Sequence, residues 1–240
     1  MRKLLALGPV LILAAACSAG AQNGDQPRSG AQGQRTFQVG AFESVSLEGS
    51  HDVVVTVGGA PSVRAEGDAE AIERLEISVE NGNLRIRSRG GGWFSREHGR
   101  VTVHVSAPSL KAASIGGSGD MRIDRAEAPR FDASISGSGD MEIAALTART
   151  AHFSIAGSGD IRAVGRGEEA NISIAGSGNA ALDSFETLRA HVSIAGSGDV
   201  GLRATETVEA SIVGSGDVTV RGTTRCSVSK LGSGDVHCAQ

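Results

Sequence analysis

A column of carboxylates is the feature of this sequence that could most directly do chemistry. The four residues Gly-Ser-Gly-Asp occur seven times between Gly117 and Asp235, at steps of 18 to 20 residues, with Asn replacing Asp in one copy. Self-similarity at a short fixed period is typical of a solenoid, whose successive coils stack equivalent residues on one another. Stacking would align the last residue of every turn, which gives the column Asp120, Asp140, Asp160, Asn179, Asp199, Asp217 and Asp235.

Two kinds of chemistry fit this column. Carboxylates about 4.8 Å apart repel one another, and a bound Ca²⁺ would relieve that repulsion. Alternatively, each Asp accepts hydrogen bonds from backbone N–H groups in its glycine-rich turn and has a structural role. Asn179 favours the structural role, because Asn keeps the acceptor oxygen but carries no charge. We therefore expect turn capping, with no metal and no cofactor, and keep a calcium-stabilised module as the alternative.

Two more polar columns precede each turn. Five residues before the first glycine lie Asp132, His152, Asn171, His191 and Glu209, all of them potential metal ligands. His152 and His191 would be about 9.6 Å apart between backbones, which is long for one ion, so a solvated face is the better interpretation. Three residues before the glycine stands a Ser in every copy. No His–Asp pair recurs beside these hydroxyls, so we expect a hydroxyl ladder and no catalytic residues.

The elements that would position these columns are short strands. Apolar residues alternate with the polar ones on both sides of each turn, and six of the seven copies have Ile two residues before the first glycine. Period-two alternation predicts two short, half-buried strands around each corner. The sequence therefore predicts an all-β protein, a β-solenoid with coils of 18–20 residues and a narrow aliphatic core.

The N-terminal residues predict export. Arg2 and Lys3 precede a short apolar run, and three alanines then lead to Cys17. This is the pattern of a signal peptide over residues 1–16, and its apolar run is too short to span a bilayer. The small residues before Cys17 resemble the bacterial lipobox, which implies lipidation of Cys17, and Ser18 resembles outer-membrane sorting. Ordinary secretory cleavage near the same place is the alternative.

Composition divides the rest of the chain. Residues 17–34 are small and polar without a hydrophobic period, so we expect a lipidated Cys followed by a flexible tether. Residues 35–240 are expected to form a single β-solenoid domain, with irregular coils over 35–108 and regular Gly-Ser-Gly-Asp coils over 109–240. Within the irregular part, residues 48–52 look like a degenerate turn, Asp68 is an expected helix N-cap, and Asn81-Gly82-Asn83 predicts a hairpin.

The terminal coil and one loop carry further candidates. Cys226 and Cys238 lie six residues before and six after Gly232, in apolar columns on opposite arms of one coil. In an oxidising envelope compartment this placement predicts a disulfide, with two buried free thiols as the alternative. Trp93 and Phe94 lie in the loop of residues 90–100. They are either a surface contact for a partner or a cap on the side or end of the solenoid.

Several blocks of sequence carry a family resemblance. Together with the turns, the segments Phe42-Glu43-Ser44-Val45-Ser46-Leu47, Glu80-Asn81-Gly82-Asn83-Leu84-Arg85-Ile86 and Ala107-Pro108-Ser109-Leu110-Lys111 resemble the putative auto-transporter adhesin head GIN domain family. The resemblance covers residues 35 to 238. It implies a right-handed single-stranded β-helix on exported bacterial envelope proteins, and it implies no defined activity.

Composition narrows the class of function. The net charge is −4 and aromatic residues make up 3% of the chain, which disfavours nucleic acid as a partner and a sugar-stacking cleft. We expect a non-catalytic envelope lipoprotein, anchored to the outer membrane by lipid and facing the periplasm or the surface. Its solenoid would serve adhesion or interaction with an envelope protein or glycan, in an oligomeric state left open. The alternatives are the calcium-stabilised module and a polysaccharide-active β-helix enzyme.

Overall fold

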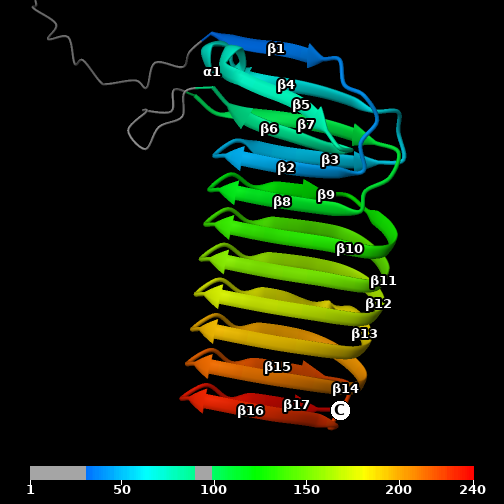
Figure 1. Ribbon diagram of the computed structural model, residues 1–240, viewed down its shortest axis with the longest axis vertical. Helices are drawn as coiled ribbons and strands as arrows, with labels where there is room; N and C mark the ends of the chain where they lie inside the picture. The colour runs from blue at the N-terminus through cyan, green and yellow to red at the C-terminus, as the bar shows by residue number, and fades with distance from the viewer. Residues whose placement is uncertain (1–30, 90–98) are drawn as a thin grey trace, which may run out of the picture.

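The structure is a computed structural model that describes residues 31–89 and 99–240. As expected, these residues form a right-handed β-helix, in which 17 strands belong to one sheet network (Figure 1). The predicted signal peptide over residues 1–16, the predicted lipidation site Cys17 and the Trp93–Phe94 pair lie outside the described residues. Within the described part of the chain, no helix is long and apolar enough to cross a membrane.

The regular coils stack in parallel with equivalent residues in register. Ile135 pairs with Ile155, and Ile155 pairs with Ile174, so the predicted isoleucine column is confirmed and is buried along the rod. The strands of these coils are β8 (Ala112–Gly117), β9 (Met121–Ile123), β10 (Ala126–Gly137), β11 (Met141–Gly157), β12 (Ile161–Gly176), β13 (Ala180–Gly196), β14 (Val200–Gly214), β15 (Val218–Arg221), β16 (Cys226–Gly232) and β17 (Val236–Ala239).

The N-terminal coils do not follow one another in sequence order. β2 pairs in parallel with both β6 and β8, and β3 does the same with β7 and β9, so the β2–β3 coil lies between the other two (Figure 1). β4 runs antiparallel to β1 and β7. The elements are β1 (Gln32–Phe37), β2 (Ser44–Gly49), β3 (Asp52–Val57), β4 (Ser62–Asp68), α1 (Ala69–Arg74), β5 (Leu75–Glu80), β6 (Asn83–Ser88) and β7 (Val101–Ala107).

Local signals in the N-terminal part are confirmed. Gly49 of the degenerate turn pairs with Gly117 and has the same left-handed backbone, with φ of 140°. Asp68 is the N-cap of α1, where its Oδ1 accepts the Ala71 N–H at 3.0 Å. β5 and β6 form the predicted antiparallel hairpin, and Asn81 and Gly82 have the positive φ of a tight hairpin turn. The first strand begins at Gln32, three residues before the expected boundary at residue 35.

The last coil ends the stack with a lysine and a disulfide. Lys230 replaces the core isoleucine, and its Nζ donates to Gly234 O at 3.1 Å and to Asp235 Oδ1 at 2.8 Å. The hydrogen bond from Lys230 and its positive charge lower the pKa of Asp235. The predicted bond between Cys226 and Cys238 is present, with an S–S distance of 2.05 Å. It links β16 to β17 across the coil.

Breaking this disulfide should weaken the terminal coil. The cysteines are 12 residues apart, so loss of the cross-link is expected to lower the free energy of unfolding by about 3 kcal/mol through loop-closure entropy. Urea denaturation with and without a phosphine reductant measures the effect. The Cys226→Ser/Cys238→Ser variant should have the same urea midpoint as the reduced protein, and the reductant should not change that midpoint. An equal urea midpoint in the oxidised and reduced proteins would contradict the expectation.

Candidate functional site

The turn carboxylates form a hydrogen-bonded ladder along one corner of the rod. From Asp120 to Asp217, each side-chain Oδ1 accepts the backbone N–H of the equivalent residue in the next coil. For example, Asp140 N–H donates to Asp120 at 3.0 Å, and Asp199 N–H donates to Asn179 at 2.9 Å. We expected bonds within each turn, but the acceptor reaches across to the neighbouring coil. Asn179 occupies the same place, since its amide oxygen accepts as the carboxylates do.

The ladder also lines a small cavity. This cavity of about 210 Å³ is bordered by Asp120, Asp140 and Asp160 together with Arg122 and Arg162. Arg122 lies 3.6 Å from Glu142, which also lines the cavity, and Arg162 supplies a second positive charge beside the carboxylates. Within residues 31–89 and 99–240, no group of three His, Cys, Asp or Glu side chains is arranged to hold a metal ion. The calcium alternative predicts a higher melting temperature in Ca²⁺ than in EGTA.

Substitutions at Asp140 separate the roles of acceptor and charge. Asp140→Ala removes the acceptor of the Asp160 N–H and is expected to cost about 1 kcal/mol. Asp140→Asn keeps an acceptor and removes repulsion from the neighbouring carboxylates, so it should match or exceed the wild-type stability at low salt. Any gain should shrink as salt screens the exposed charges. Equal losses in the Asn and Ala variants, measured by chemical denaturation, would rule out the acceptor role.

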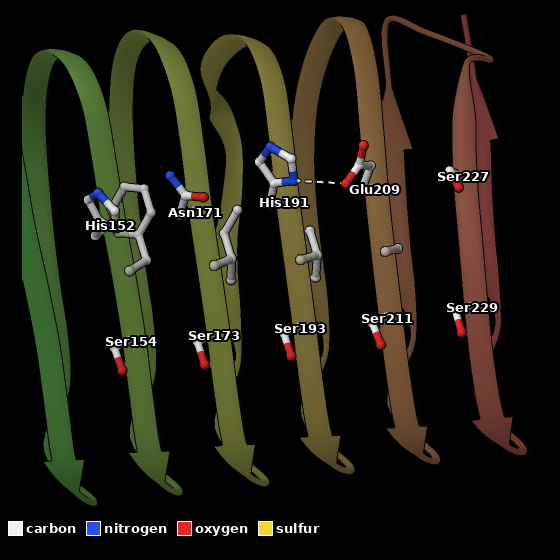
Figure 2. Close-up of a pocket in the computed structure, with 14 residues that line it drawn as sticks. His152, Ser154, Asn171, Ser173, His191, Ser193, Glu209, Ser211, Ser227 and Ser229 are labelled. Atoms are coloured by element: carbon white, nitrogen blue, oxygen red, sulfur yellow. Dashed lines mark ion pairs between the residues drawn. The ribbon is translucent and has the colours of Figure 1, made fainter.

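A shallow groove of about 500 Å³ crosses five successive coils on another part of the surface. It lies over β11, β12, β13, β14 and β16, whose strands run side by side (Figure 2). Residues three and five positions before each turn face outward together, because side chains alternate along a strand. The outer row is His152, Asn171, His191, Glu209 and Ser227, and the inner row is Ser154, Ser173, Ser193, Ser211 and Ser229.

The polar groups of this groove are mostly available for a ligand. His191 Nδ1 lies 3.2 Å from Glu209 Oε2, and Asn171 donates to Glu169 Oε1 at 2.9 Å. The serine hydroxyls of the inner row make no hydrogen bond with any other described residue. Closer to the N-terminus the same serine column is self-bonded, since Ser114 donates to Ser46 at 2.8 Å. The groove thus offers repeated free donors and acceptors at the spacing of the strands.

Sequence reasoning found both columns but treated them as a solvated face and a hydroxyl ladder. A column of equivalent residues in the sequence gives their spacing along the rod axis. Whether they line a groove depends on how each strand bends across that axis. The structure brings His152 and His191 into one groove with Asn171 between them, and Glu209 pairs with His191. It does not bring the turn carboxylates into this groove.

Fold and surface together define a β-solenoid protein that presents ladders of polar side chains. Residues 41–224 match the family described as "Putative auto-transporter adhesin, head GIN domain", and the chain belongs to this family. The family description names an adhesin head and no catalytic activity, and it indicates a protein of the cell envelope or surface. No curated protein matches the chain.

Solved structures share the fold. A putative adhesin from Bacteroides fragilis NCTC 9343 is 22% identical with a TM-score of 0.80, covering 88% of this chain and 98% of its own. A putative adhesin from Parabacteroides merdae ATCC 43184 is 20% identical with a TM-score of 0.69, covering 87% and 96%. A putative lipid binding protein from Parabacteroides distasonis ATCC 8503 is 23% identical with a TM-score of 0.68, covering 87% and 97%.

Proposed function

We propose that this protein is a non-catalytic adhesin-like lipoprotein that binds an extended envelope polymer, either a protein or a glycan. The polymer lies along the groove of about 500 Å³ with its two polar rows, here called the serine groove. The observation that supports this most is the pair of polar rows over five successive coils, whose inner hydroxyls have no partner among the described residues. A ligand lying along the rod could repeat one weak contact on every coil. Many weak contacts in series give useful affinity without a deep pocket, as expected of an adhesion surface.

The composition of the groove supports binding over catalysis. Glycoside hydrolysis requires a pair of carboxylates on the two sides of the scissile bond. Among the described residues, Glu209 is the one carboxylate that lines the groove, and it is already paired with His191. Phe153 is the single Phe, Tyr or Trp among the lining residues that the structure describes, and its ring belongs to the buried core. A polysaccharide-active site would need more of both kinds of residue.

A blocking substitution tests the groove. Ser173→Arg/Ser193→Arg would fill its centre with two long charged side chains on exposed positions. Ser158→Arg, on an exposed turn outside the groove, is the matched control. We expect wild type and the control to bind the same glycans on an array, or the same envelope proteins cross-linked on intact cells. The groove variant should lose at least about tenfold in affinity. Undiminished binding by a folded groove variant would refute this site.

We also propose that Cys17 carries a lipid that anchors the protein to the outer membrane. The support is the alanine-rich run before Cys17 and the polar segment that follows it. Metabolic labelling with a fatty acid should mark the wild type, whereas Cys17→Ser should be unlabelled and soluble after cell lysis. An unlabelled wild type found only in the soluble fraction would instead support ordinary secretory cleavage.

A further inference from the structure

A second cavity, of about 770 Å³, lies where the N-terminal coils meet the regular ones. Its volume falls in the range of ligand sites, roughly 300–1,000 Å³. It is lined by the end of β3, the loop that follows β7, the start of β10 and the middle of β11. None of the residues that line the serine groove lines this cavity.

One wall of this cavity is an unpaired strand edge. The first part of β10, residues 126–130, pairs with β11 on one side, while β8 joins its other side only from Asp132 onward. The equivalent residues 146–150 of β11 are paired on both sides. Asp124 and Asp132 donate to Val55 O and Lys111 O at the two ends of the gap. Pro129 has no N–H, so the parallel pairing of Ala128 with Ala148 uses the N–H of Ala128. Because peptide groups alternate in direction along a strand, the N–H and C=O of Glu127 point into the gap.

Two arginines and one glutamate lie on the rim of the cavity. Arg125 has only a long ion pair with Asp124, at 3.7 Å, and Asp124 Oδ1 already accepts the N–H of Val57 at 2.9 Å. Arg149 forms no ion pair with any described residue, and neither does Glu127. The floor between these charges is apolar and includes Val57 and other buried residues of the core, namely Ala126, Ala128 and Ala148.

We propose that this cavity binds a short extended peptide segment that carries acidic side chains. The peptide adds a strand to the free edge of β10, where it bonds the N–H and C=O of Glu127, and its carboxylates contact Arg125 and Arg149. Strand addition supplies main-chain hydrogen bonds, and the flanking charges select the sequence. Pro129 has no N–H to donate and limits the pairing to a few residues, which favours a short peptide over a long strand of a second copy.

Binding of synthetic peptides to the mature protein tests this proposal. The probe is a blocked hexapeptide in which Asp and Val alternate. It is compared with the Lys–Val analogue and with an Asp–Val peptide N-methylated at alternate backbone amides. Arg125→Glu/Arg149→Glu removes the selecting charges. Arg166→Glu is the control, because Arg166 is exposed on the next coil, has no ion pair among the described residues and lies outside the cavity.

The acidic peptide should shift the amide resonance of Glu127 and bind wild type and the control alike. Binding should weaken about tenfold or more with the double Glu variant, the Lys peptide or the N-methylated peptide. Absence of binding at millimolar peptide, or equal binding by the double Glu variant, would overturn the proposal. Equal binding of the N-methylated peptide, or of decanoate as a simple anionic amphiphile, would show anion binding without strand addition and would also overturn it.

Discussion

Gly157→Ala is expected to lower the free energy of unfolding by at least about 3 kcal/mol, from strain and steric conflict at one corner of the rod. Gly157 has φ of 140°, a conformation that side chains with a Cβ rarely adopt. An added Cβ would also lie far inside van der Waals contact of the carbonyl oxygen of Gly137 in the preceding coil. That oxygen accepts the N–H groups of Ser158 and Gly159, so the coil cannot move away without losing both hydrogen bonds.

Companion variants separate the two causes. Gly159→Ala places a Cβ against the carbonyl oxygen of Gly139 at a position whose φ is not left-handed, so it should show the steric conflict alone. Ser158→Ala, on the exposed residue of the same turn, should change the stability by less than about 0.5 kcal/mol. Urea and thermal denaturation measure all three. A Gly157 variant as stable as the Ser158 variant would mean that the corners tolerate side chains.

Phe153→Ala is expected to cost about 3–5 kcal/mol, the usual penalty for truncating a buried phenylalanine. Phe153 is 1% exposed, and its ring meets that of Phe185 edge to face, with centroids 5.7 Å apart. The neighbouring coils cannot refill the space, because Phe153 stacks between the small Ala133 and Ile172, which is held in its own register. The cavity would therefore persist in the narrow core of the rod.

The partner ring provides the control for this prediction. Phe153→Leu keeps most of the buried volume and should cost clearly less than the alanine variant. A double-mutant cycle with Phe185→Leu should give a coupling energy of about 0.5–1.5 kcal/mol for the aromatic pair. Gly167 makes room for Phe185, since a Cβ there would lie 3.0 Å from the ring. A loss below about 1 kcal/mol for Phe153→Ala would indicate that the rod relaxes around the cavity.

The regular part of the rod could be predicted from sequence because its information is local and repeated. Every copy has the same glycine corner and the same outward serine, and six of the seven have the same inward isoleucine. A departure in one copy therefore does not obscure the pattern that the others share. The disulfide followed for the same reason, since Cys226 and Cys238 fall in columns that the repeat had already placed inside one coil. The degenerate turn at Gly49 could be recognised because residues 49–52 keep the Gly, the Ser and the final Asp of the repeat.

The N-terminal part could not be predicted in the same way. The β2–β3 coil lies between the β6–β7 coil and the β8–β9 coil. No local pattern in residues 35–108 predicts this order, because it depends on which strand edges meet in space. The cavity beside Arg125 and Arg149 is a consequence of this arrangement, since the N-terminal coils stop short of the side on which β10 begins. Non-local pairing decides such features, and no short segment encodes them.

For the turn carboxylates themselves, the sequence determined their number, their spacing and their place on one corner of a solenoid. It also showed, through Asn179, that an acceptor oxygen matters more there than a negative charge. Only the tertiary structure decided which N–H groups they bind, because the partner belongs to the next coil, about 20 residues away along the chain. Hydrogen-bond partners follow distance in space, and in a solenoid the nearest donor is one coil away.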